Sequence, residues 1–279
     1  MKTRLQTISR FSLGAVLTAI ACLPANAQIA IGTSLRNDIE VSPDHRYTGT
    51  IVIKNSSGEE QQAKIYQTDY LFRSDGTNEF GEPGTAVRSN APWVHVSASS
   101  VTVPPNGSVP LDYAVEVPLD LKGEPLNGSY WSMVMVEGIP SESAERTIGV
   151  ADSDIRLGVR QVIRYGIQIA THVRGTGESR LNPMEQTVTV LEDGRAELRL
   201  DVENLGTRYV VPKTWVEIYA QDGAAVGRFD GADARIYPGT SVRQRYNLGV
   251  LDPGPYTALV IFDSGGEVVD AVEYAILIE

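Results

Sequence analysis

One stretch, residues 155–173, constrains the fold of this chain more than any other. From Ile163 to Val173 apolar side chains occupy alternate positions, and small or polar residues occupy most of the positions between them. This two-residue period is that of a β-strand, whose successive side chains point to opposite faces of a sheet. At roughly 3.3 Å per residue, one strand over the whole stretch would span about 60 Å. The sequence therefore predicts a long strand that connects two domains and presents an edge.

The same period recurs along the rest of the chain, with turns rich in Gly, Pro and Asn between the apolar runs. No window after residue 28 has the apolar stripe of a helix, so we expect an all-β fold. About seven strand-length runs follow residue 181, which is the pattern of an immunoglobulin-like sandwich. The preceding block fits a similar sandwich with longer loops. We expect two immunoglobulin-like β-sandwich domains in tandem, at residues 28–175 and 180–279.

Residues 1–27 have the pattern of a cleaved secretory signal peptide. Three basic residues precede an apolar run at 11–23 that is too short to span a bilayer, and a small-residue cleavage site follows at 25–27. Cys22 offers an alternative lipoprotein site, although Ala19 stands where such sites usually carry leucine. We expect an exported protein without stable membrane insertion, which in a bacterium with two membranes means a periplasmic one.

Charge and cysteine usage limit the classes of partner and of stabilisation. The chain has a net charge of −11, and loss of the basic signal would make it more negative. An acidic balance of this size argues against nucleic acid or anionic lipid as a partner. Cys22 is the single cysteine, so the mature chain has no disulfide and needs a sizeable apolar core.

The run at residues 126–137 is apolar on both faces. In an exposed two-sheet sandwich the outer face of each sheet normally meets water, so a doubly apolar strand predicts that something covers its outer face. A central strand covered by its own loops is the alternative. The two faces carry Tyr130, Val134 and Val136 on one side and Trp131, Met133 and Met135 on the other.

No motif predicts catalysis or a metal site. The Asp-Ser-Gly triplet at 263–265 resembles that of aspartic proteases, but it occurs once and that chemistry needs two carboxylates. A turn between two strands explains the triplet better. His45, His95 and His172 are scattered without the close spacing of metal ligands. We therefore expect a protein that is not an enzyme and holds no cofactor.

Arg156, Arg160 and Arg164 are spaced by four within the long alternating stretch. On one strand they would lie on the same side, about 13 Å apart. Such a row would either receive a carboxylate of a partner or discourage unwanted pairing at an exposed edge.

The order of the motifs resembles that of the two-domain periplasmic chaperones of the chaperone–usher pilus pathway, over essentially the whole mature chain. The resemblance implies a chaperone that binds an exported β-rich pilus or surface-fibre subunit, with an outer-membrane usher as a further partner. The motifs are Lys54-Asn55 at a strand end, the Pro-Pro-Asn-Gly turn at 104–107, the segment 128–140, the long strand, and the segments 202–206 and 235–240.

In that family the last strand of the first domain lends alternate apolar side chains to a subunit that lacks a strand, which is β-augmentation. The resemblance implies that Arg164 replaces the family's carboxylate-binding lysine, whereas Ile39 stands near the place of its first-strand arginine. The residues matched to donation are Ile163, Tyr165, Ile167 and Ile169, with Trp131, Met133 and Met135 as supporting residues.

Residues 92–107 also resemble the first domain of Gram-positive surface proteins that hold WxL proteins at peptidoglycan. Those proteins end in a membrane helix and a basic tail, whereas this sequence ends on a strand pattern at Ile278-Glu279. This resemblance implies the alternative function, a cell-surface or peptidoglycan-associated binding module.

Overall fold

The computed structural model describes residues 29–139, 146–149, 156–159, 162–265 and 270–279, so the predicted signal peptide lies outside the described residues. Within them the regular secondary structure is β-strand apart from η1 (Ala91–Trp93), the one helical turn. The strands of the first sandwich and its hairpins are β1 (Ile29–Ile31), β2 (Arg36–Val41), β3 (His45–Asn55), β4 (Gln61–Phe72), β5 (Asn78–Gly81), β6 (Val94–Val96), β7 (Ser100–Val103), β8 (Ser108–Val117), β9 (Asp120–Leu121), β10 (Glu124–Pro125), β11 (Ser129–Ile139), β12 (Arg146–Gly149), β13 (Arg156–Val159) and β14 (Arg164–Val173).

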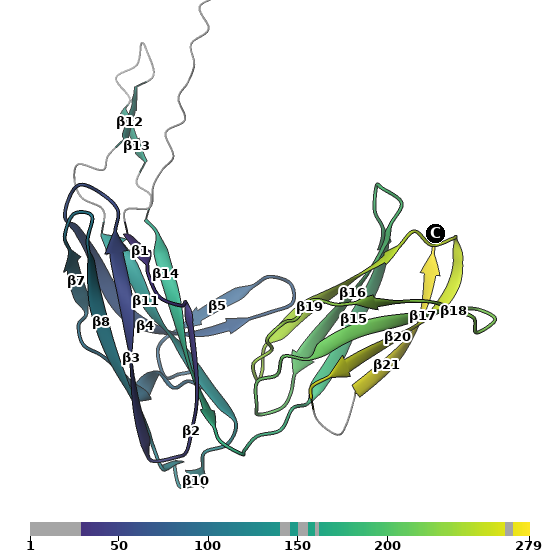
Figure 1. The fold of residues 1–279 in the computed structure, drawn as a ribbon, viewed down its shortest axis with the longest axis horizontal. Coiled ribbons are helices and arrows are strands. Elements are labelled where there is room, and N and C mark those ends of the chain that lie inside the picture. The colour runs from purple at the N-terminus through teal and green to yellow at the C-terminus, as the bar shows by residue number, and fades with distance from the viewer. Residues whose placement is uncertain (1–28, 140–145, 150–155, 160–161, 266–269) are drawn as a thin grey trace, which may run out of the picture.

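Two sheets face each other in the first sandwich (Figure 1). One has the strand order β1-β3-β8-β6, and the other has the order β2-β14-β11-β4-β5, with β7 also paired with β4. Ile51 and Ile53 of β3 and Leu111 of β8 are fully buried between the sheets. Their positions follow from the two-residue period, which sends every second side chain of a strand toward the core.

The second sandwich has its own core. Its sheets have the orders β15-β16-β19 and β18-β17-β20-β21, and Leu198, Leu200 and Ile218 are fully buried between them. The predicted all-β fold with two immunoglobulin-like sandwiches in tandem is confirmed. The strands are β15 (Leu181–Val190), β16 (Ala196–Asn204), β17 (Lys213–Ala220), β18 (Ala225–Asp230), β19 (Ser241–Gly249), β20 (Gly254–Asp263) and β21 (Asp270–Ile278).

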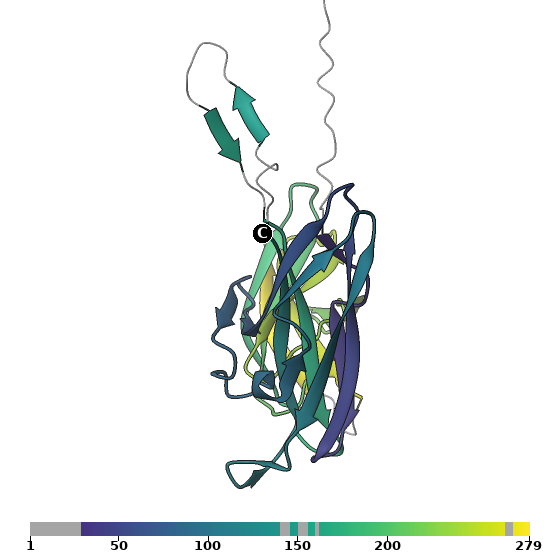
Figure 2. The same cartoon turned by 90° about the vertical axis from the view of Figure 1, so that its left-hand side faces the viewer.

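The single strand predicted over residues 155–173 is wrong. β14 begins at Arg164, and β13 is a separate strand that pairs with β12 in a two-stranded hairpin. This hairpin stands away from the first sandwich in both views (Figures 1 and 2). The physical reason is that alternation sets the direction of side chains but not the pairing partner of a strand. Residues 156–159 find their partner in β12 rather than in the sheet that contains β14.

The two sandwiches are in direct contact. The turn after β4 reaches the second sandwich, where Ser74 Oγ donates a hydrogen bond to Asp201 Oδ2 at 2.9 Å. At a second contact Trp131 and Tyr237 pack together, with ring centroids 4.7 Å apart. The prediction that something covers the outer face of the doubly apolar strand is confirmed at Trp131, where the cover comes largely from the second sandwich.

Candidate functional site

The edge of β14 is the main candidate site. One side of β14 pairs with β11 over its whole length, from Arg164 opposite Glu137 to His172 opposite Ser129. The other side pairs with β2, but only over residues 168–173. Among the described residues, nothing pairs with this side at residues 164–167. We call residues 164–167 the open half of β14 and residues 168–173 the closed half.

The register assigns the backbone groups at the open edge. The Val173 amide bonds toward the β11 side, whereas the Gln168 amide donates outward, to the Leu35 carbonyl at 2.8 Å. In an antiparallel pair the backbone groups of alternate residues point to the same side. Arg164 and Gly166 therefore direct their N–H and C=O groups to the open edge, where an extended segment can bind them.

The four apolar side chains expected to be donated lie in two different environments. Ile167 and Ile169 of β14 are fully buried in the core of the first sandwich. Ile163 and Tyr165 are half-buried, and Tyr165 packs against the edge of the same core. The sequence pattern predicts the same role for all four residues, but the core of the first sandwich already encloses Ile167 and Ile169.

Exposed apolar side chains lie beside the open half of β14. Val162 is 42% exposed and Ile139, at the end of β11, is 44% exposed. The two segments are adjacent, since the Gly138 amide donates to the Ile163 carbonyl at 3.3 Å. The open half thus combines unpaired backbone with accessible apolar surface.

The supporting residues expected on β11 also divide between two regions. Trp131 is buried at the contact with the second sandwich, beneath Tyr237. Met133 and Met135 lie beside Gly166 of β14, where an added Cβ would lie 2.9 Å from the Met133 sulfur and 3.3 Å from that of Met135. The two methionines therefore fill the outer face above the open half, whereas Trp131 belongs to the contact between sandwiches.

The arginine row expected on one long strand is not formed by one strand. Arg156 belongs to β13, Arg160 lies outside the described residues, and Arg164 begins β14. The Arg164 Nε is 2.9 Å from Glu137 Oε2. This ion pair is a contact within one sheet, with Arg164 still mostly exposed.

Arg36 on β2 is a residue that reasoning from the sequence did not single out. It stands opposite Gln168 in the sheet, on the same face as Arg164 and about 13 Å from it along β14. The position matched along the sequence is Ile39, but pairing in the sheet brings Arg36 to this face. Its Nε lies 3.1 Å from Asp38 Oδ2.

Asp38 connects the sandwiches at the closed half. Tyr237 donates a hydrogen bond to Asp38 Oδ1 at 3.0 Å. Arg235 Nη1 lies 2.9 Å from Oδ2, which is an ion-pair distance without the alignment of a hydrogen bond. Burial alone would raise the pKa of Asp38, but His172, the Arg235 charge and Tyr237 outweigh it and lower this pKa. Asp38 is therefore a carboxylate at neutral pH. The burial of the Tyr237 ring, together with the charge of Asp38, raises the pKa of Tyr237.

Ser129, His172 and Asp38 have the composition of a hydrolase triad but not its arrangement. Ser129 Oγ lies 2.9 Å from His172 Nδ1 and accepts the N–H of Tyr209 at 3.0 Å. Ser129 has no exposed surface, so its hydroxyl cannot reach a substrate. The His172 Nε2 lies 3.5 Å from Asp38 Oδ1. These residues hold the second sandwich against the closed half of β14, a role that spacing along the sequence does not reveal.

The other residues considered for chemistry have structural positions. The Gly265 amide donates to Asp263 Oδ1 at 2.8 Å, directly after β20, which pairs with β21. The turn interpretation of the Asp-Ser-Gly triplet is confirmed. His45 is exposed at the start of β3, and His95 lies 3.9 Å from Glu116.

The described residues have neither a metal centre nor a membrane-spanning helix. They contain no group of three or more His, Cys, Asp and Glu side chains placed to hold a metal ion. They also include no helix with the length and apolar character needed to cross a membrane.

These features define an all-β protein of two tandem sandwiches with a partly open strand edge. No protein-family model and no curated protein matches the sequence. The chain is similar in structure to solved pilus chaperones. The class 5 fimbriae chaperone CfaA is 12% identical, with a TM-score of 0.46 and coverage of 89% of this chain and 98% of that chain.

Two further solved structures give similar values. The Salmonella enterica complex of the SafA pilin with the SafB chaperone has 13% identity, a TM-score of 0.42 and coverage of 89% of this chain and 96% of that chain. The Escherichia coli chaperone DraB has 14% identity, a TM-score of 0.39 and coverage of 88% and 95%. We therefore base the functional assignment on the residues of this chain.

Proposed function

We propose that this protein is a periplasmic chaperone-like protein that binds an exported pilus or surface-fibre subunit by strand pairing at the open half of β14. A partner strand would bond to the outward backbone groups of Arg164 and Gly166, and its alternate side chains would contact Ile163 and Tyr165. The observation that carries the proposal is the extent of β2, which covers residues 168–173 and leaves the open half unpaired among the described residues.

The residues expected at the site take different roles in this proposal. Ile167 and Ile169 anchor β14 in its own sandwich, because both are fully buried, and Met133 and Met135 support the open half from its outer face. The protein acts without catalysis or cofactor, follows the export route given by a signal at residues 1–27, and folds as units at 28–175 and 180–279. An outer-membrane usher would receive the complex.

Replacing Arg164 with proline tests strand pairing directly. Proline lacks the N–H that faces the open edge, and residue 164 uses no amide bond to β11, so the sheet itself is preserved. Prolines are tolerated at sheet edges for this reason. Arg164→Ala is the matched control, because it removes the same ion pair with Glu137 but keeps the N–H.

The experiment is pull-down of the mature chain from a periplasm that also contains its neighbouring exported proteins. We expect one small β-rich protein in equal stoichiometry with the wild type and Arg164→Ala, and at least about tenfold less with Arg164→Pro. Undiminished capture by a folded Arg164→Pro variant, or no capture by the wild type, would overturn the proposal. Retention of all three chains on cell-wall material would support the surface-binding alternative instead.

A further inference from the structure

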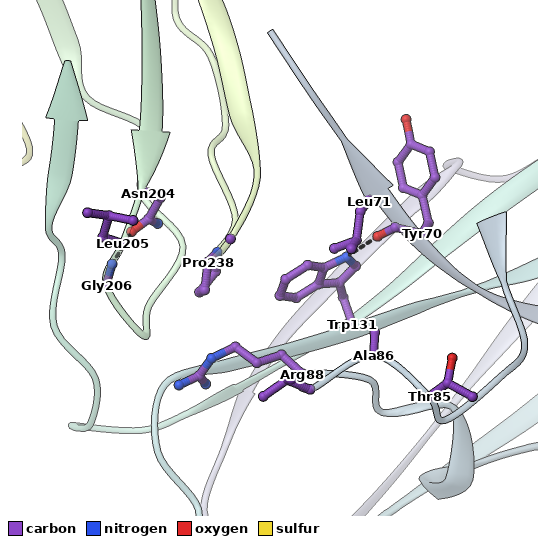
Figure 3. Close-up of a pocket in the computed structure, with 12 residues that line it drawn as sticks. Tyr70, Leu71, Thr85, Ala86, Arg88, Trp131, Asn204, Leu205, Gly206 and Pro238 are labelled. Carbon is purple, nitrogen blue, oxygen red and sulfur yellow. Dashed lines mark hydrogen bonds between the residues drawn. The ribbon is translucent and has the colours of Figure 1, made fainter. Parts of the chain in front are cut away.

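A cleft of about 450 Å³ lies between the two sandwiches (Figure 3). The first sandwich contributes Leu71, Arg88 and Trp131 to its lining, and the second contributes Leu205 and Pro238. This volume is in the range of protein ligand sites, which are typically mostly apolar with a few polar groups. The cleft is separate from the open half of β14, since it is lined from β4, the segment before η1, and β11.

Arg88 is the one charged side chain among the described residues that line the cleft. It extends from the first sandwich toward the loops that carry Gly206 and Pro238 (Figure 3). The chain is acidic overall, yet the charge in this cleft is positive. Such a cation favours an anionic ligand.

Hydrogen bonds within the protein use only some of the N–H groups of the Arg88 guanidinium. Nη1 donates to the carbonyls of Asn127 at 2.8 Å and Ser129 at 3.3 Å, and the group lies 5.3 Å from the Tyr130 ring centroid. Within the described residues no carboxylate lies within ion-pair distance of Arg88. By contrast, the other part-buried arginines of the described chain, Arg73, Arg199, Arg208 and Arg235, all have one.

This arrangement has an energetic cost that a ligand would offset. Arg88 is half-buried, and burial lowers its pKa. A desolvated charge without an opposite charge is unfavourable, and a bound anion supplies the missing compensation. Exposed apolar side chains lie on both sides of the cleft, Val87 at 94% and Leu205 at 42% exposure. The site therefore suits an anion that has apolar neighbours.

We propose that this cleft binds an acidic side chain of a partner protein, flanked in the partner's chain by apolar residues. The carboxylate would bond to the Arg88 guanidinium, which has no carboxylate at ion-pair distance among the described residues, and the flanking residues would contact Val87 and Leu205. The cleft and the strand edge are independent sites, because neither uses a residue of the other.

The test uses the full mature chain and two synthetic peptides, N-acetyl-Leu-Glu-Leu-amide and its isosteric control N-acetyl-Leu-Gln-Leu-amide. Isothermal titration calorimetry should show at least about tenfold tighter binding of the glutamate peptide. Arg88→Gln should abolish this preference, and Arg88→Lys should keep part of it. Arg174→Gln should leave it unchanged, since Arg174 also lacks a carboxylate partner among the described residues but lies outside the cleft.

Equal binding of the two peptides, or no binding of either at up to about 5 mM, would overturn the proposal. So would a preference that persists in Arg88→Gln. Circular dichroism establishes that each variant folds. If Arg88→Gln does not fold, the test is made on the wild type instead, whose preference for the glutamate peptide should be lost at high salt. The peptide titrations do not involve strand pairing. A negative result there would overturn the cleft proposal and leave the strand-pairing proposal, tested by Arg164→Pro, untouched.

Discussion

The two halves of β14 share one sequence pattern but differ in what surrounds them. The open half has no partner on its outer side among the described residues, and Tyr165 is half-buried. The closed half pairs with β2, and Ile169 is fully buried. Alternation therefore fixes which face a side chain occupies, whereas the neighbouring strand decides whether the backbone edge is paired or open.

A buried polar network fixes the closed half. Asn90 Nδ2 donates to the Ile169 carbonyl at 3.1 Å and to Thr171 Oγ1 at 3.0 Å. Ser132 Oγ donates to Asn90 Oδ1 at 2.7 Å, and Tyr47 bonds to the Thr171 hydroxyl at 2.8 Å. Bonds of this kind rigidify a core when every member is satisfied. The closed half is thus held rigidly in the first sandwich.

Truncating Ile169 of the closed half and Ile163, which lies just before the open half, should give the largest contrast. Ile169→Ala leaves a cavity in the core and should lower the free energy of unfolding by about 2–5 kcal/mol. Ile163→Ala removes a half-buried side chain and should cost less than about 1 kcal/mol. Urea unfolding followed by circular dichroism measures both, and equal losses would contradict the difference in burial between Ile169 and Ile163.

Gly128, whose carbonyl accepts the Val173 amide of β14 at 2.8 Å, should be the next most sensitive position. It has a φ of 78°, and an added Cβ would collide with the carbonyl of Thr207 in the second sandwich. We expect Gly128→Ala to cost about 2–4 kcal/mol and to change the angle between the sandwiches in small-angle X-ray scattering.

Gly194→Ala is the control for Gly128→Ala. Its φ of 80° gives the same backbone strain, but no atom lies within 4 Å of an added Cβ. It should cost about 1 kcal/mol and leave the scattering profile unchanged. If both variants lose the same stability and keep the wild-type profile, the contact at Gly128 does not hold the sandwiches together.

The sequence predicted those features that depend on neighbours along the chain. Alternation predicted which sheet face Ile167 and Trp131 occupy, and the Asp-Ser-Gly triplet predicted a turn. The sequence did not reveal that β14 begins at Arg164, because residues 156–159 alternate in the same way but pair with β12. Pairing partners are set by contacts between segments far apart in the chain, which periodicity does not encode.

The candidate sites were less predictable than the fold for the same reason. Arg36 reaches the face of Arg164 through its register with β14, not through its place in the sequence. The contact of His172 with Ser129 joins residues 43 positions apart. Arg88 is informative because no carboxylate of the described residues lies at ion-pair distance from it, and spacing along the sequence does not show which charges are close in space.

Substitution of Asp38 should lower stability less than Ile169→Ala or Gly128→Ala does. Its effect should also depend on pH. Asp38→Asn weakens the contacts with Arg235 and Tyr237 and should lower the free energy of unfolding by about 1–3 kcal/mol at pH 5. Asp230→Asn removes the acid of an exposed pair with Arg228, 3.3 Å long, and should change stability by less than about 0.5 kcal/mol.

The sign of the pH dependence follows from the lowered pKa of Asp38. A carboxyl group with a lower pKa in the folded state stabilises the fold above its ordinary value of about 3.9, and this contribution is lost as the pH falls through the folded-state pKa. The difference in stability between the wild type and Asp38→Asn should therefore shrink below about pH 4. Urea unfolding of both chains at several pH values between 5 and 2.5 measures it. A difference that persists unchanged to pH 2.5 would mean that Asp38 contributes through packing rather than charge, and the closed half would then be held by its hydrogen bonds and apolar core alone.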